Sequence, residues 1–499
     1  MKLGWNSVTT PLVLTITCGR CKGRRFCVSQ NHPVDPQSEK RRACMQTSKN
    51  QKKLSRSLQS RHIQMIAIGG AIGTGLFLGS GSAIRTSGPS IILAYLIVGL
   101  FCFFMMRAIG ELLLSDTSKH SFLDFVKEYL DDRMEFVTGW LYWFCWISLA
   151  MADLTATGIY IKYWFPSLPQ WVAPFVILIL LYLTNRVNVK AFGEMESWFS
   201  MIKVLAIIIL VVVGFALAII HFKVDGQTAS FANLVNHGGF FPTGGYGFLM
   251  SFQMVVFAFV GIEMVGLTAG ETNDPEANLP KAINSLPIRI GLFYVGSMIA
   301  IMSVYPWNGI TTTASPFVQV FSGIGITGAA GILNFVVLTA ALSATNSCLF
   351  STSRTLHALS HGGNAPKRFM MLSKSGVPND SLNFSTLVLF IIVILNYFMP
   401  ASVFTLISGV STINFVLVWV ILLWCHIKYR QANPAGAKAF RMPGYPVTDW
   451  VSLIFFCAVL VFLLFNASTR VSMIISLVVF AVMLVVYRPV SVENGNVQK

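Results

Sequence analysis

Long apolar runs separated by short polar segments make up most of the chain after residue 61. Runs such as 91–106 and 204–220 hold almost no polar side chain, and a helix of ~20 apolar residues spans a bilayer. Because a helix pairs its own backbone groups, it is the element that such runs form in lipid. The pattern predicts an all-α membrane protein with twelve transmembrane helices. Their expected positions are 63–84, 89–114, 136–164, 171–184, 197–222, 248–269, 286–306, 328–358, 382–398, 402–428, 449–466 and 470–487.

The composition supports a multi-pass membrane protein. Only 11% of the residues are charged and 54% are hydrophobic, with a mean hydropathy of +0.66, whereas soluble domains carry about 25% charged residues. The loops that this topology places inside are richer in Lys and Arg than the outer loops, which indicates that both termini are cytoplasmic. The lipid bilayer is therefore an expected partner.

The formal charge of +16 is concentrated at the N-terminus, where residues 1–61 hold thirteen of the 36 Lys and Arg residues. A nucleic-acid-binding protein carries its basic residues on a folded domain, so no nucleic-acid partner is expected. We predict that residues 1–55 form a basic, disordered cytoplasmic extension. The membrane domain is expected at 56–490, with a short cytoplasmic tail at 488–499.

Two of the predicted helices carry signs of interruption. Residues 67–84 hold six glycines, and glycine weakens a helix by about 1 kcal/mol relative to alanine. Residues 257–266 hold two more glycines around Glu263. The spans containing them are the first and the sixth, so one is inverted relative to the other. Paired broken helices of this kind indicate a transporter site, although in the first span alone close helix packing explains the glycines equally well.

Broken helices expose backbone groups at mid-membrane. N–H groups at a half-helix start favour a carboxylate, and free carbonyl groups favour an ammonium, so a site of this kind fits an amino-acid zwitterion. We assign Gly73 and Gly75 to this binding backbone. The side chain of Thr74 either contacts substrate or caps the half-helix.

Three ionisable residues lie inside predicted helices, where each costs about 2.5–3.5 kcal/mol. Glu263 coincides with the break and is predicted to be functional. Asp153 is either a buried structural partner or part of gating or proton coupling. Lys203 is either functional or extends its ammonium to the cytoplasmic surface. Arg107 and Glu111, one turn apart, are expected to form a structural pair.

No enzyme, metal site or cofactor is predicted. The eight histidines form no cluster with a nucleophile or base, and Cys18 and Cys21 lack the second tight ligand pair of a zinc site. A rival of another class is a transporter-like amino-acid sensor. Such a sensor should carry a long terminal signalling domain, whereas the chain after Arg488 is short.

Several long motifs carry a family resemblance. The segments 60-SRHIQMIAIGGAIGTGLFLGSG-81, 193-GEMESWFSMIKVLAI-207 and 334-NFVVLTAALSATNSCLFSTSR-354 resemble the amino acid transporter family of the APC superfamily. The resemblance implies a 5+5 inverted repeat with helices 1 and 6 broken. It also implies proton-coupled symport in a bacterial cytoplasmic (inner) membrane, with substrate and proton as partners. The repeats would cover about 60–222 and 247–428, followed by two extra helices at about 449–487.

The resemblance also implies roles for individual residues. The N–H groups of Thr74 and Gly75 would bind the substrate carboxylate, and the carbonyls of Ala71, Phe257 and Val260 would bind its ammonium. Lys203 and Glu263 would serve proton coupling and gating, and Phe257 and Phe259 are gate candidates. Residues 139–153 and 281–290 resemble family members that carry D-serine, D-alanine and glycine. Aromatic amino acids, GABA and proline stay open as alternatives.

Overall fold

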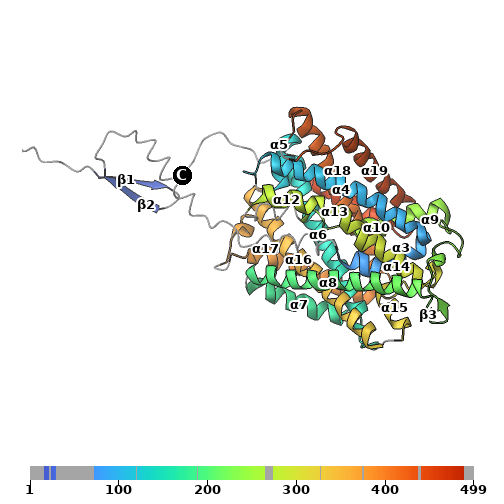
Figure 1. Cartoon of the computed structure of the whole chain (residues 1–499). Helices are drawn as coiled ribbons and strands as arrows, with labels where there is room; N and C mark the ends of the chain where they lie inside the picture. Colours follow the sequence, from blue (N-terminus) through green and yellow to red (C-terminus); the bar gives the residue numbers. More distant parts are fainter. Residues whose placement is uncertain are drawn as a thin grey trace, which may run out of the picture. The chain divides into compact units, whose positions relative to one another are not determined.

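The structure is a computed structural model that describes residues 16–21, 24–29, 72–119, 121–187, 189–264, 274–325, 327–373, 376–436 and 440–487. It divides the chain into two compact units, Met1–Leu54 and Ser55–Lys499. The larger unit is built almost entirely of helices (Figure 1). This agrees with the predicted all-helical class.

The N-terminal unit contains one antiparallel strand pair, which the sequence analysis did not predict. Strand β1 (Ile16–Cys21) pairs with β2 (Arg24–Ser29), and Cys18 lies opposite Cys27. The rest of residues 1–55, and the tail at 488–499, lie outside the described residues. For those parts the predicted extension and tail stay predictions.

The first helical element in the described part of the larger unit is a π-helical turn, and helices that follow the apolar runs come after it. Their bounds are η1 (Gly75–Gly79), α3 (Ser80–Ser87), η2 (Gly88–Ser90), α4 (Ile91–Ser115), α5 (Phe122–Tyr129), α6 (Asp132–Ile161), α7 (Val172–Val187), α8 (Val189–Ile219), η3 (Phe231–Leu234), α9 (Gly244–Met250), α10 (Phe252–Phe257), α12 (Pro275–Asn284), α13 (Leu286–Arg289), η5 (Ile290–Val295), α14 (Gly296–Val304), η6 (Trp307–Gly309), α15 (Pro316–Gly323), α16 (Thr327–His361), η7 (Lys367–Met370), α17 (Asn379–Phe398), α18 (Val403–Ala432), α19 (Val447–Phe465) and α20 (Arg470–Val486). The short strands β3 (Lys223–Val224) and β4 (Gln227–Thr228) form a small hairpin between α8 and α9.

Within the described residues, eight helical runs are long and apolar enough to cross a membrane. The first, Gly75–Ser115, covers two predicted spans, which the η2 turn separates. Three shorter apolar helices, Val172–Arg186, Gly244–Phe257 and Arg470–Val486, coincide with further predicted spans. The membrane-spanning helical class is therefore confirmed, while the count of twelve and the 5+5 repeat stay predictions.

Two long helices form the centre of the larger unit. The most apolar windows of α6 and α18 are 78% and 83% buried, against 28% for α19. Helix α6 packs against both α16 and α18, and α18 also packs against α4, α10 and α19 (Figure 1). Side chains on α6 and α18 therefore reach several neighbouring helices, whereas α19 presents most of its surface outward.

The short helix α5 buries one apolar face. Ser121 and Asp124 form a capping box at its start, which satisfies free backbone N–H groups. Its apolar residues Phe122, Phe125 and Val126 are buried, and the helix packs against α6 and α18. This apolar face is covered by the protein itself.

Candidate functional site

The first membrane helix starts in the middle of an apolar run. Ile72 and Gly73 are not helical, and the helix begins at Thr74 and continues as η1. The carbonyl of Gly73 accepts from the N–H groups of Leu76 and Phe77, both at 3.2 Å. The first N–H groups of a helix have no acceptor within it and lie at its positive end. A buried helix start of this kind suits a carboxylate. Ala71 lies outside the described residues.

The sixth predicted span breaks where the sequence indicates. Helix α10 ends at Phe257, and turns follow through Glu263. Gly261 has a φ of +92°, a conformation that favours glycine because a side chain would clash with the backbone. Residues 265–273, with Gly266, lie outside the described residues.

The two interrupted segments meet backbone to backbone. A Cβ atom built on Gly75 would lie 2.7 Å from the Cα of Ala258 and 3.0 Å from the carbonyl oxygen of Phe257. Only glycine permits this approach. It brings the helix start at Thr74 next to the carbonyl groups that follow α10. At Gly73, by contrast, a Cβ would meet only the Ala344 Cβ, at an ordinary 3.9 Å.

Asp153 lies against the start of the first helix. The Thr74 hydroxyl donates a hydrogen bond of 2.6 Å to its Oδ1, and both side chains are buried. Thr74 makes no side-chain capping bond to its own helix, so this hydroxyl is committed to α6. Asp153 Oδ2 has no hydrogen-bond partner among the described residues. The carboxyl group therefore keeps one acceptor for a proton or a further donor.

Lys203 on α8 points into the protein and is 1% exposed. Its Nζ donates a hydrogen bond of 2.9 Å to the Ser343 hydroxyl on α16. Its charge also acts on the Asp153 carboxyl group. The ammonium is therefore buried, which does not match the interpretation in which it extends to the cytoplasmic surface. Its role in function stays a prediction.

Glu263 is fully buried beside the break in the sixth span. Its Oε2 accepts a hydrogen bond of 3.3 Å from Trp419 Nε1 on α18, and its Oε1 has no partner among the described residues. Burying a carboxyl group with an unpaired oxygen costs free energy. An ionisable residue inside a membrane segment is therefore a candidate for a functional role. Asp153 is thus bonded to the start of the first helix, Lys203 to α16 and Glu263 to α18.

The three predicted apolar site residues form a packed wall. Phe259 stacks on Tyr294 with ring centroids 4.6 Å apart, and the Tyr294 hydroxyl donates to the carbonyl of Ala258 at 3.1 Å. Phe257 packs edge-on against Phe404 at 6.1 Å. Val260 is 5% exposed. Large aromatic rings therefore occupy the space beside the break.

Comparisons with known proteins agree with this geometry. The family described as "Amino acid permease" matches residues 62–492. The chain belongs to the amino acid permease family. It is 54% identical over 448 residues to "Amino-acid permease AapA" of Bacillus subtilis (strain 168), covering 89% of this chain and 97% of that protein. It is 49% identical over 428 residues to the "D-serine/D-alanine/glycine transporter" of Escherichia coli (strain K12), covering 85% and 91%.

A solved structure shares the fold of this permease. A single-site mutant of the manganese transporter of Eremococcus coleocola superposes with a TM-score of 0.56 at 14% sequence identity. The match covers 85% of this chain and 92% of that one. The similarity shows a common transporter fold, in agreement with the membrane-spanning helices described above.

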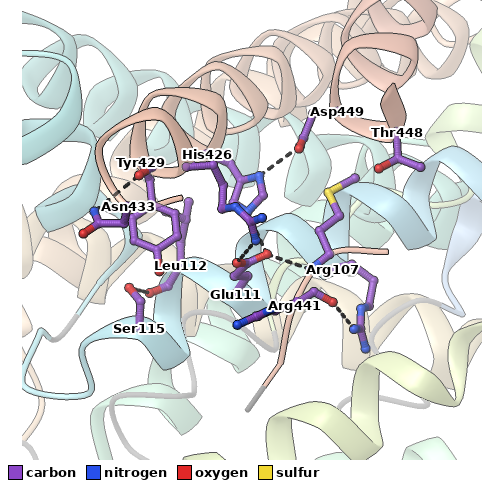
Figure 2. A network of polar contacts seen from close by, with 12 residues as sticks. Arg107, Glu111, Leu112, Ser115, His426, Tyr429, Asn433, Arg441, Thr448 and Asp449 are labelled. Atoms are coloured by element: carbon purple, nitrogen blue, oxygen red, sulfur yellow. Dashed lines mark hydrogen bonds and ion pairs between the residues drawn. The ribbon is translucent and has the colours of Figure 1, made fainter. Parts of the chain in front are cut away.

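A second buried polar cluster of the permease lies where α4 ends (Figure 2). Glu111 accepts hydrogen bonds from Arg430 at 2.6 Å, from the Met442 N–H at 2.6 Å and faces His426 Nε2 at 3.2 Å. Arg107 contacts Asn284 and the carbonyl of Arg441. The predicted pairing of Arg107 with Glu111 stays a prediction, and two further donors to Glu111 come from Arg430 on α18 and from the Met442 N–H, which precedes α19.

Several residues of the permease's site were not predicted. Tyr294 and Trp419 contact the broken part of the sixth span, and Ser343 accepts a hydrogen bond from Lys203. Tyr294 stands in an apolar run with no signal around it. Trp419 does carry a signal in the sequence, because Thr412 and His426 lie seven positions before and after it, on the same face of a helix. Among the described residues, no group of three His, Cys, Asp or Glu side chains is arranged to hold a metal ion.

Proposed function

We propose that this permease imports small neutral amino acids together with protons across the bacterial cytoplasmic membrane by alternating access. D-alanine, D-serine and glycine are the favoured substrates. The observation that carries the proposal is the close approach of Gly75 to Ala258, which brings a helix start and a helix end together inside the protein. A relative of 49% identity is a "D-serine/D-alanine/glycine transporter".

The proposed binding mode uses the backbone of both broken segments. N–H groups of Gly73, Thr74 and Gly75 bind the substrate carboxylate at the positive end of the helix. The carbonyls of Phe257 and Val260, with that of Ala71, bind the ammonium. A zwitterion is matched in this way by partial charges, so no fully charged partner is needed.

The proposed preference for small side chains follows from the packing beside the break. The ring pairs Phe259–Tyr294 and Phe257–Phe404 fill the space next to the carbonyl groups. A substrate with a bulky side chain would have to displace these rings. The alternatives are a permease for aromatic amino acids, GABA or proline, and a transporter-like sensor.

Proton coupling is assigned to the buried charges next to the first helix. Lys203 and Asp153 interact, and Asp153 is bonded to Thr74. Binding or loss of a proton here changes the charge that the first helix faces, and this change reaches the substrate-binding backbone through Thr74. Glu263 is assigned to gating of the sixth span, with Phe259 as part of the gate.

Uptake by membrane vesicles tests the proposal. Labelled glycine, D-alanine, L-phenylalanine and GABA are offered with and without an imposed proton gradient. We expect accumulation of glycine and D-alanine that depends on the gradient. Uptake of these two that ignores the gradient would refute proton coupling. Preferred uptake of L-phenylalanine or GABA would instead select one of the alternative permeases, and binding without any uptake would select the sensor.

A further inference from the structure

Three buried polar side chains lie along one face of α18. Thr412, Trp419 and His426 are spaced seven residues apart, and two helical turns take ~7.2 residues. All three are 0% exposed. A polar group in an apolar interior costs free energy unless it finds a partner, so the partners show what this face of α18 holds.

The first two side chains hold the broken sixth span on both sides of its break. The Thr412 hydroxyl shares its one proton between the carbonyl of Ser408 on its own helix, at 2.8 Å, and the carbonyl of Gln253, at 3.2 Å. Its oxygen also accepts from the Gln253 side-chain amide at 3.5 Å. Trp419 Nε1 donates to Glu263 at 3.3 Å. Gln253 precedes the end of α10 and Glu263 follows it. One helix therefore spans the interruption.

The third side chain fixes the end of α18 to two other helices. His426 Nδ1 lies 2.9 Å from Asp449 on α19, and its Nε2 lies 3.2 Å from Glu111 on α4 (Figure 2). Ionised carboxylates only accept hydrogen bonds, so the ring donates to both only when both nitrogens carry a proton. Arg430, one turn further along α18, adds a second cation against Glu111. Two cations then match two carboxylates.

We propose that the polar face of α18, formed by Thr412, Trp419 and His426, is the positioning element for the broken sixth span. Trp419 orients the Glu263 carboxyl group, Thr412 fixes the helix before the break, and His426 anchors α18 to α4 and α19. None of the three touches substrate in this arrangement. The part assigned to Trp419 rests on the proposed gating role of Glu263.

A double-mutant cycle tests whether Trp419 acts through Glu263. Trp419→Phe keeps an aromatic ring but removes the N–H donor, and Glu263→Leu removes both the charge and the acceptor oxygens. Initial uptake rates are measured in vesicles with whichever of glycine, D-alanine, L-phenylalanine and GABA the unmodified protein takes up. We expect each single change to lower the maximal rate by roughly tenfold or more with KM changed less than about threefold, and the double variant to fall no further.

A matched control is available on the same helix. Trp424 is 39% exposed, and its ring interacts with Lys428 and Trp450, which are exposed as well. Trp424→Phe should leave uptake within about twofold of the unmodified protein, since surface substitutions have small effects. If Trp419→Phe lowers uptake by the same factor with and without Glu263→Leu, Trp419 acts elsewhere and the proposal is overturned.

A second measurement needs no substrate. The same four proteins are unfolded by heat in detergent, where coupled residues give non-additive shifts of the midpoint temperature. Additive shifts would overturn the contact itself. If the unmodified protein takes up none of the four labelled amino acids, the proposed function fails. The thermal cycle then still shows whether Trp419 and Glu263 are coupled.

The other end of α18 is tested in the same way with the pair His426→Gln and Glu111→Gln. Their effects on uptake rate and on the midpoint temperature should likewise be non-additive, and additive effects would remove His426 from the positioning element.

Discussion

The hydroxyl of Thr74 donates a 2.6 Å hydrogen bond to the carboxylate of Asp153. The first residue sits where the first membrane helix begins and the second lies in the middle of α6. Because the bond is buried, it fixes the start of one helix to the most central part of another. A change of charge at Asp153 therefore changes the electrostatic surroundings of the backbone at Thr74, which the proposed function assigns to substrate binding.

Thr74→Val should reduce uptake strongly, because valine has the shape of threonine but no donor. Leaving a buried charged acceptor unpaired costs about 1–3 kcal/mol, and 1.4 kcal/mol is a factor of ten in an equilibrium constant. We expect a fall of about tenfold or more in the uptake rate of labelled glycine. Thr74→Ser, which keeps the hydroxyl, is the control and should retain most of the activity. Equal loss in both variants would show that the methyl packing of Thr74, not the bond to Asp153, is what matters.

Lys203→Ala should abolish accumulation driven by the proton gradient while some exchange of internal for external substrate remains. The ammonium is buried against Ser343 and interacts with Asp153, so its removal takes away the proposed coupling charge without touching the binding backbone. Accumulation and counterflow are measured on the same vesicles. Lys428→Ala, at an exposed position of α18, serves as the control. Unchanged accumulation in Lys203→Ala would mean that Lys203 has a structural role only.

Gly75→Ala should prevent transport. The added Cβ would lie 2.7 Å from a backbone atom of Ala258, a distance that one of the two broken segments has to relieve by moving. Overpacking of this kind costs typically about 1–3 kcal/mol. Gly291→Ala, where a Cβ would meet nothing within 4 Å, is the matched control. Glycine uptake and the amount of protein in the membrane are compared for both variants, and normal transport by Gly75→Ala would contradict the close approach.

Removing residues 1–50 should leave transport intact. These residues fall within a separate compact unit, Met1–Leu54, and the family match begins only at residue 62. The shortened and full chains are compared for uptake after the amount in the membrane has been measured for each. Loss of transport in a shortened protein that reaches the membrane would show that the basic segment takes part in function.

The hydropathy of the sequence was enough to predict the helices of this permease. A run such as 91–106 forms the centre of α4 because a helix is the element that satisfies its own backbone in an apolar surrounding. The break after Phe257 could be predicted for a related reason, since Gly261 takes a backbone conformation that other residues avoid. Signals of this kind lie within a few neighbouring residues.

What joins these helices was decided by the tertiary structure alone. Thr74 and Asp153 are 79 positions apart, and Lys203 and Ser343 are 140 apart, so no local pattern connects them. Glu111 shows the same limit, because its neighbour Arg107 was the expected partner and no sequence signal indicated that Arg430 of another helix donates to it as well. The sequence by itself determined which runs form apolar helices and that the sixth span breaks near Gly261. Which buried polar groups pair was set by the packing of distant helices, since each such group takes whichever partner that packing brings within hydrogen-bond distance.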